Sequence, residues 1–216
     1  VNLLENNKIL LKKIAEKLGL IAFSSPFDKT SVDFLEKMDV PAYKIASFEI
    51  TDIPLIETVA SCGKPVIIST GIAEFNDSKL AIETCKKQGN DQIALLKCTS
   101  SYPAPIDSIN LKTIPHMTEN FKTVVGLSDH SLEPVIPIGA VALGAKIIEK
   151  HFILDRKMGG PDSKFSLEPE EFSSMVNSVR TLETAMGKVS YELDDATRAS
   201  CDFSRSLFVV KDVKKG

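Results

Sequence analysis

The sequence predicts an α/β fold built on a parallel sheet and closed as a (β/α)8 barrel. Six short runs rich in β-branched and apolar residues recur along the chain. They lie roughly 20 to 30 residues apart, which is about the length of one βα unit. Helix-like stretches occupy the intervals between them. Each run also finishes in polar side chains, as barrel strands do at the face where active sites are built.

The predicted strands can be placed in chain order from these apolar runs. They are residues 20–26, 42–47, 64–70, 93–101, 123–129 and 145–152. Strands alternating with helices fit a closed barrel or an open, doubly wound sheet. Neither GxGxxG nor GxxxxGK[ST] occurs, which weakens the open nucleotide-binding sheet and favours a TIM barrel. Because a closed barrel needs eight strands, we expect the first two βα units to be missing from this chain.

The helices expected between the strands carry their own start and stop signals. Residues 30–38 have apolar side chains at helical spacing, residues 53–63 end in a glycine, and residues 76–90 open with an Asn/Asp cap. Residues 129–145 are predicted to be a loop followed by a helix of small residues. The segment around His116 is predicted to be a loop with that histidine at the surface. The clearest amphipathic helix is residues 168–187, with an apolar face of Phe172, Met175, Val176, Val179, Leu182 and Met186.

The composition is that of an ordinary soluble protein, with 216 residues, 43% hydrophobic and 25% charged. A net charge of -3 gives no reason to expect nucleic acid or an anionic membrane as a partner. No apolar run approaches the roughly 20 residues of a membrane span, and residues 1–20 are predicted to form an amphipathic helix, not a signal peptide. The four cysteines form no CxxC pair, so we expect reduced thiols in the cytoplasm.

Two consecutive predicted strands each present a histidine beside a carboxylate at the carboxyl end. His130 follows Asp129, and His151 lies two residues after Glu149. Imidazole suits manganese, iron, cobalt or zinc, and Asp129, Glu149 and Asp162 could complete or orient the ligand set. The alternative is a buried histidine satisfied by a hydrogen bond, which one histidine alone would favour. Two histidines on neighbouring strand ends favour a metal site.

Two lysines, Lys44 and Lys97, lie late in predicted strands. Together with Ser47, Ser69 and Ser128 they could hold a phosphate, with lysine as a point charge and the hydroxyls as donors. One alternative is a lysine whose stem follows the barrel strand and whose ammonium reaches solvent. Another is a Schiff base with a keto acid, as in class I aldolases.

Two loops are expected to border the mouth of the barrel. The segment MGGPDSKFS contains Asp162 and follows the strand that ends at His151, so it should lie over the mouth. The segment SSYPAP places Tyr102 and two prolines beside the strand of Lys97. It is either a rigid turn or an aromatic wall for a sugar.

Taken together, several motifs resemble the sialic acid synthase family, whose members condense phosphoenolpyruvate with an amino sugar. The resemblance runs from about Ile21 to about Gly187. Within the family, IASFEITD and KCTSSYPAP are most similar to the pseudaminic acid synthases, and legionaminic acid synthases are the nearest alternative. The motifs are FSSPFD, YKIASFEITDIPLI, GKPVIISTG, LLKCTSSYPAP, VGLSDHS, GAVALGAKIIEKHF and GGPDSKFSLEPEEF.

The resemblance implies a partial (β/α)8 synthase barrel over residues 1–190. Residues 191–216 would be a linker and the start of a truncated antifreeze-like (SAF) domain, in a cytoplasmic, domain-swapped homodimer. It also implies that His130 and His151 bind a divalent metal, Mn²⁺ or Mg²⁺. The family's first two strands supply a catalytic glutamate and a phosphate-binding lysine, and the antifreeze-like domain supplies an arginine. None of these lies in this chain, so we expect it to lack part of the site.

The same resemblance implies roles for the polar residues at the strand ends. Ser100 stands where the N-acetylneuraminate enzymes have asparagine, so its contact with the sugar is expected to differ. The residues expected to bind phosphoenolpyruvate or the sugar are Lys44, Ser47, Ser69, Lys97, Ser100, Tyr102, Ser128 and Asp162. The residues expected to be catalytic are Glu49, Glu149 and Asp129.

The implied reaction joins phosphoenolpyruvate to 2,4-diacetamido-2,4,6-trideoxy-altrose, giving the nine-carbon pseudaminic acid and phosphate. Glu149 or Glu49 would accept a proton from the attacking water. N-acetylneuraminate and legionaminic acid synthases, which use other sugars, are the close alternatives. A Schiff-base aldolase and a non-catalytic sugar-binding protein are the more distant ones.

Overall fold

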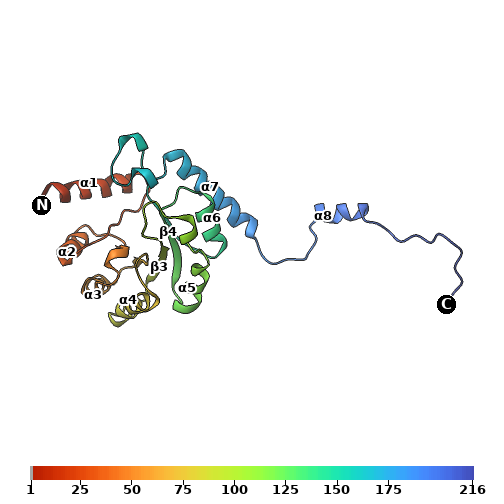
Figure 1. The fold of residues 1–216 in the computed structure, drawn as a ribbon, viewed down its shortest axis with the longest axis horizontal. Coiled ribbons are helices and arrows are strands. Elements are labelled where there is room, and N and C mark those ends of the chain that lie inside the picture. The colour runs from red at the N-terminus through yellow and green to blue at the C-terminus, as the bar shows by residue number, and fades with distance from the viewer. Residues whose placement is uncertain (1) are drawn as a thin grey trace. The chain divides into compact units, whose positions relative to one another are not determined.

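The computed structural model describes residues 2–216, which divide into two units, one that ends at Ala185 and one from Met186 to Gly216. The first unit holds a five-stranded sheet in which every neighbouring pair is parallel. Figure 1 shows helices in an arc around its strands. The strands are β1 (Tyr43–Ile45), β2 (Val66–Ser69), β3 (Ile93–Cys98), β4 (Val124–Asp129) and β5 (Ile148–Lys150).

The order of the strands in the sheet is β1-β2-β3-β4-β5, the same as their order in the chain. In a doubly wound sheet the strand order reverses at a switch point, and in this sheet it does not. Successive crossovers of one hand leave the helices on one face and curl the sheet toward a barrel. The predicted α/β fold with a partial barrel is therefore confirmed.

The helices of the first unit follow the strands as expected, and one further helix, α5 (Thr113–Phe121), was not predicted. Within the described part of the chain, no helix is both long and apolar enough to cross a membrane. The helices are α1 (Asn2–Lys17), α2 (Lys29–Lys37), α3 (Ile53–Ser61), α4 (Phe75–Lys87), α5 (Thr113–Phe121), α6 (Val135–Ala142) and α7 (Pro169–Met186). Short 3-10 turns are η1 (Ser47–Glu49), η2 (Ile106–Ser108), η3 (Arg156–Met158) and η4 (Ser163–Phe165).

Helix α5 corrects the prediction of a loop around His116. Ile114, Met117 and Phe121 are buried at helical spacing. Pro115 lies in the first turn, where the missing N–H would have no helical partner in any case. The proline and the polar residues around it hid a short amphipathic pattern. His116 itself is exposed, as predicted.

The first predicted strand, residues 20–26, makes only an isolated bridge between Ser24 and Tyr43. Lys44 N donates to Ser24 O at 3.3 Å, and Pro26, two residues later, has no N–H to extend the ladder. The predicted apolar face of α7 is only partly covered. Met175 is buried, whereas Met186 is 50% exposed.

Alternation along the strands divides their side chains between the two faces of the sheet. Apolar residues on one face form the core against the helices, among them Ile45, Ile68, Leu95 and Leu127. Residues of the opposite parity near the carboxyl ends line a pocket, among them Lys44, Ser69, Cys98, Ser128 and Glu149. The core therefore fixes which side chains enter the pocket.

Gly126 in β4 leaves no room for a side chain. A Cβ there would lie 2.4 Å from Ile147 O and 2.7 Å from Leu96 Cδ2. We expect Gly126→Ala to lower the free energy of unfolding by about 2 to 3 kcal/mol, since a rigid carbonyl must move. Chemical denaturation of the full-length natural protein measures this. The matched change is Gly139→Ala, whose Cβ would meet only Leu111 Cδ1, at 3.1 Å. Equal losses in the two variants would contradict the prediction.

Glu36 on α2 links that helix to β1 and to the segment before β2. Its Oε1 accepts from Tyr43 Oη at 2.5 Å and lies 2.8 Å from Lys64 Nζ. The bonds from Lys64 and Tyr43 lower the pKa of Glu36 below its ordinary value of 4.5. Folding is therefore favoured above that value, and this contribution is lost as the pH falls through the lowered pKa.

We expect Glu36→Gln to flatten the dependence of Tm on pH on the acid side of 4.5. Thermal melts across that range test this. Glu57→Gln, at an exposed position of α3, serves as the control and should keep the wild-type profile. If Tm of Glu36→Gln falls at acid pH as steeply as that of the wild type, Glu36 does not contribute to the pH dependence of stability.

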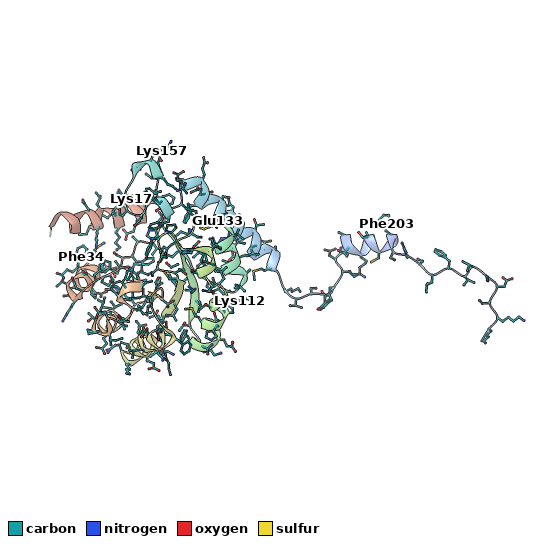
Figure 2. The ribbon with its side chains drawn as sticks, viewed as in Figure 1. Lys17, Phe34, Lys112, Glu133, Lys157 and Phe203 are labelled. Atoms are coloured by element: carbon teal, nitrogen blue, oxygen red, sulfur yellow. The ribbon has the colours of Figure 1, made fainter. Side chains whose placement is uncertain are left out.

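The second unit contains helix α8 (Asp195–Ser200) and the turn η5 (Cys201–Phe203). Asp194 caps α8 by accepting from Thr197 N at 2.7 Å. Phe203, labelled in Figure 2, is 91% exposed. Residues 204–216 form no strand in this unit, where residues 191–216 were predicted to be a linker and the start of an antifreeze-like domain. A strand needs a hydrogen-bonded neighbour, so the assignment to that domain stays a prediction.

Candidate active site

The carboxyl ends of all five strands surround a cavity of about 360 Å³. A barrel fold places its active site at this face. The residues that line it come from β1 to β5, from the segments that follow these strands and, for Ser25, from the segment before α2. The lining consists of Ser25, Lys44, Ala46, Ser47, Ser69, Cys98, Tyr102, Ser128, His130, Glu149, Lys150 and His151.

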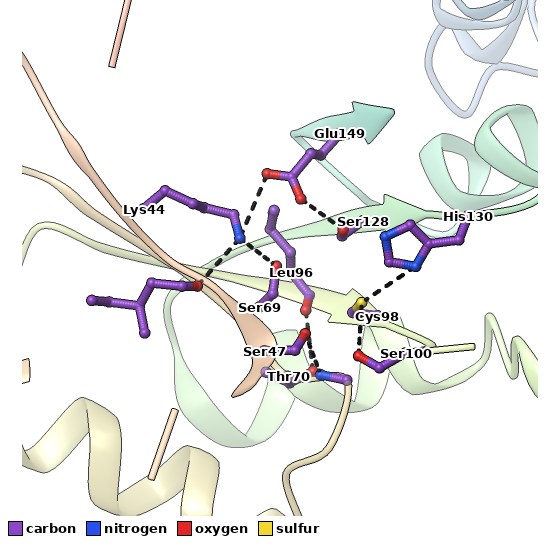
Figure 3. Close-up of polar contacts among 12 residues, drawn as sticks. Lys44, Ser47, Ser69, Thr70, Leu96, Cys98, Ser100, Ser128, His130 and Glu149 are labelled. Carbon is purple, nitrogen blue, oxygen red and sulfur yellow. Dashed lines mark hydrogen bonds and ion pairs between the residues drawn. The ribbon is translucent and has the colours of Figure 1, made fainter. Parts of the chain in front are cut away.

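Lys44 is the centre of a hydrogen-bonded network across the floor of this cavity (Figure 3). Its Nζ donates to Ser69 Oγ at 2.7 Å and to Ile45 O at 3.2 Å. Glu149 Oε2 lies 3.6 Å from the same ammonium, while Glu149 Oε1 accepts from Ser128 Oγ at 2.7 Å. Burial lowers the pKa of Lys44, and Glu149 opposes this. The network presents one cation and two hydroxyls to a bound anion.

Ser47 and Gly71 close the pocket on the side of β1 and β2. Gly71 N donates to Ser47 Oγ at 3.1 Å. A Cβ at Gly71 would lie 2.0 Å from Ser100 Oγ and 2.8 Å from Ser47 Oγ, so a side chain there would displace both hydroxyls. Ser100 lies 3.8 Å from Cys98 Sγ and is not part of the lining. Its predicted contact with a sugar stays a prediction.

His130 is held by contacts of its ring and by a hydrogen bond from Ala104 N to its backbone carbonyl. Its Nδ1 lies 2.9 Å from Thr99 O and 3.9 Å from Cys98 Sγ. A carbonyl oxygen only accepts, so Nδ1 carries the proton and Nε2 keeps its lone pair. Burial lowers the pKa of His130, but the bonds to Cys98 and Thr99 outweigh burial and raise it.

His151 stands beside His130, with 5.2 Å between the ring centroids. Its Nδ1 lies 3.5 Å from Asp162 Oδ2. Burial and the nearby His130 lower the pKa of His151. A ring whose Nδ1 faces a carboxylate leaves Nε2 for a metal, as in carboxylate–histidine–metal sites.

This donor set fits a divalent metal to which the protein supplies two imidazoles. Among the residues that the structure describes, no three His, Cys, Asp or Glu side chains lie close enough to hold a metal ion. Water or substrate oxygens would therefore fill the remaining positions, as in catalytic sites that keep open coordination. The assignment of His130 and His151 as ligands stays a prediction.

The ring of Tyr102 lines the pocket, and the ring of Phe165 packs behind it, outside the lining. The Tyr102 ring centroid lies 4.4 Å from that of His130 and 5.2 Å from that of Phe165. Phe165 is buried and packs edge-on against His151 at 4.9 Å. The segment of Tyr102 was predicted to be either a rigid turn or an aromatic wall for a sugar, and contact of Tyr102 with a sugar stays a prediction. Phe165 was missed. The signal for Phe165 was its place in the loop expected to lie over the mouth.

Cys98 was also missed, although it lines the pocket. It pairs in register with Ser128, so the two side chains share a face. Burial raises the pKa of Cys98, but hydrogen bonds from His130 and Ser47 lower it further, to about 7. No clear signal in the sequence identified it, because polar residues follow one another in IALLKCTSS without alternation.

Other predicted site residues lie outside the lining. Lys97, next to Cys98, faces the other way, and its Nζ donates to Cys98 O at 2.7 Å and to Thr99 Oγ1 at 3.1 Å. Asp129 is 2% exposed and pairs with Lys150. Glu49 has a buried Oε2 without a hydrogen-bond partner among the described residues. The catalytic and binding roles of these residues stay predictions.

Comparisons with known proteins agree with this geometry. Residues 1–191 match the NeuB family. A pseudaminic acid synthase of Campylobacter jejuni is 46% identical over 202 residues, covering 94% of this chain and 59% of that protein. An N,N'-diacetyllegionaminic acid synthase of the same species is 40% identical over 205 residues, covering 94% and 61%. The chain thus spans about three-fifths of the length of these curated relatives.

A solved structure also has the same fold. It is the N-acetylneuraminic acid synthetase of Leptospira borgpetersenii serovar Hardjo-bovis in complex with citrate. The TM-score is 0.85 and the identity 33%, over 92% of this chain and 70% of that one. The curled parallel sheet of this chain is therefore shared with that synthetase.

Proposed function

Because the chain belongs to the NeuB family, we propose that it forms most of the pocket of a pseudaminic acid synthase. The substrates are phosphoenolpyruvate and 2,4-diacetamido-2,4,6-trideoxy-altrose, and the products are pseudaminic acid and phosphate. The observation that carries the proposal is a buried lysine network facing two imidazoles across one cavity. The 46% identity to a pseudaminic acid synthase supports the choice of sugar.

Lys44 and the serines beside it form the half of the pocket that suits phosphoenolpyruvate. That substrate carries a phosphate and a carboxylate, both of which need cations and hydroxyl donors. Lys44 is 8% exposed, and Ser69 and Ser128 are 2% and 3% exposed. Hydrogen bonds to charged groups that are shielded from water are stronger than those in water. The side chains of Lys44, Ser69 and Ser128 would therefore position the substrate.

His130 and His151 form the half that suits the aldehyde end of the sugar. They would hold Mn²⁺ or Mg²⁺, which as a Lewis acid would polarise the aldehyde oxygen. Asp162 Oδ2 beside His151 and Thr99 O beside His130 set the orientation of the two rings. The ring of Tyr102 provides an apolar surface for one face of the sugar.

The reaction joins C3 of phosphoenolpyruvate to the aldehyde carbon, and the aldehyde oxygen takes up a proton. Water then adds to C2, and Glu149 accepts the proton that this water loses. The bond from C2 to the phosphate oxygen breaks, phosphate leaves, and C2 becomes the ketone of the product. Lys44 Nζ lies 3.6 Å from Glu149 Oε2, and its positive charge would stabilise both this carboxylate and the leaving phosphate.

The test is phosphate release from phosphoenolpyruvate by the full-length natural protein, with Mn²⁺ or with a chelator. Three sugars are offered: the altro-configured diacetamido sugar, its manno-configured relative and N-acetylmannosamine. We expect metal-dependent release with the altro sugar alone. Release with only the manno sugar identifies a legionaminic acid synthase instead, to which the 40% identical relative points. No release with any sugar from a folded protein refutes a synthase.

A Schiff-base reaction at Lys44 predicts a different result in the same assay. Turnover would then persist in chelator, and borohydride with a keto acid would attach the acid covalently to the lysine. We expect neither, because the ammonium of Lys44 is engaged by Ser69 and Glu149.

A further inference from the structure

A buried ion pair lies directly behind the two histidines. Lys150 Nζ is 2.9 Å from Asp129 Oδ2, and each side chain is 1% exposed. The two residues are partners in the register of β4 and β5. Alternation places their side chains on the face of the strands opposite to Ser128 and Glu149, although Lys150 also borders the pocket at the end of β5. The pair therefore joins the two strands that present His130 and His151, without entering the polar network of Lys44.

The same two side chains hold the backbone on the carboxyl side of His130. Asp129 Oδ1 accepts from Ser131 N at 2.9 Å, and Lys150 Nζ also donates to Ser131 O. Ser131 is thus bound through both its N–H and its carbonyl. His130 lies between two anchored residues, and His151 directly follows Lys150.

The backbone of each histidine also accepts one hydrogen bond, from Ala104 N to His130 O at 3.2 Å and from Leu167 N to His151 O at 2.9 Å, but neither bond joins β4 to β5. Strand β5 has three residues, and His151 lies beyond its end. Phe152 makes only an isolated bridge to Leu167. A buried ion pair adds little net stability compared with apolar residues of the same volume, because desolvation offsets its attraction. Its directional contacts nevertheless define one register between the strand ends.

We propose that Asp129 and Lys150 are positioning residues that set the separation and orientation of His130 and His151. This inference rests on the proposed function, because it assigns the two imidazoles a joint task. Asp129, predicted from the sequence to be catalytic, then acts through His130 and not on the substrate. Lys150, which the sequence did not single out, has the same role toward His151.

The test is the double variant Asp129→Asn/Lys150→Met in the full-length natural protein, since removing both partners avoids a lone buried charge. Nitrogen NMR spectra of the histidine rings are recorded in chelator, alongside steady-state kinetics with metal. We expect the signals of His130 and His151 to move while that of His116 stays in place. We expect kcat to fall about 10- to 100-fold, the range seen when groups that orient metal ligands are lost. KM for phosphoenolpyruvate should stay within about threefold, because Lys44 is untouched.

The matched control is Glu36→Gln/Lys64→Met, which removes a partly exposed pair, 2.8 Å apart, at the opposite end of the strands. It should leave the signals of His130 and His151 and the value of kcat unchanged. If the first double variant does not fold, Lys150→Arg gives the same readouts, because it keeps the charge pair and alters only its geometry.

Unmoved histidine signals with kcat within about twofold of wild type in a folded variant overturn the proposal. The same changes in the control variant also overturn it, because they would follow from lost stability alone. The ring spectra do not depend on the reaction. A wild-type protein inactive with every sugar therefore counts against the proposed function, while the spectra still judge the positioning role.

Discussion

Lys44→Met should lower kcat/KM for phosphoenolpyruvate by about 100- to 1,000-fold, the range found when one preorganised donor is removed from a charged site. The change removes the cation that lies 2.7 Å from Ser69 Oγ and 3.6 Å from Glu149 Oε2. It leaves the buried hydroxyl without its partner and the carboxylate without its counter-charge. Phosphate release measured at varied phosphoenolpyruvate separates the effect on KM from that on kcat.

The matched variant is Lys97→Met, in the neighbouring part of the same sheet. Burial lowers the pKa of Lys97 as it does that of Lys44, but Lys97 donates to Cys98 O and Thr99 Oγ1 and is not itself part of the pocket lining. We expect a fall in kcat/KM of less than about fivefold, or roughly 1 kcal/mol. Equal losses of kcat/KM in the two variants, with Tm unchanged, would contradict the prediction. They would mean that Lys97 contributes as much as Lys44, although its side chain points to the other face of the sheet.

The second large effect is expected at His151. His151→Ala removes one of the two imidazoles whose centroids lie 5.2 Å apart, and with it the partner of Asp162 Oδ2. We expect metal-dependent phosphate release to fall by at least about 100-fold, because changes to groups that only orient a ligand already cost 10- to 100-fold. Titration of turnover with Mn²⁺ and direct measurement of Mn²⁺ binding both test this.

His116→Ala is the control for this experiment. His116 is exposed on α5, with its ring centroid 6.0 Å from that of Phe75. Its removal should leave both Mn²⁺ binding and turnover at the wild-type level. Mn²⁺ binding that survives in His151→Ala, at wild-type affinity, would show that the pocket histidines hold no metal.

Local patterns in the sequence were sufficient for the fold class and for much of the pocket. The spacing of the apolar runs identified β1 to β5, because the period of a βα unit is a property of the chain itself. Lys44, Ser69, Ser128 and Glu149 could be placed together because parallel strands bring their carboxyl ends to one face. His130 and His151 could be placed beside each other for the same reason.

Other features were obscured because the local pattern was ambiguous. In the run IALLKCTSS, polar residues follow one another without alternation, so parity could not be assigned, and Lys97 was predicted in the pocket where Cys98 lies. A shift of one residue moves every side chain of a strand to the other face. Helix α5 was missed because a proline in its first turn resembles a turn signal.

Only the tertiary structure decided which side chains meet across distant segments. It brought Phe165 against His151 and paired Asp129 with Lys150. The sequence determined by itself the order of the elements and the face at which polar strand ends converge, because both follow from short-range periodicity. Contacts between strands depend on register and packing, which come from burying the whole core at once.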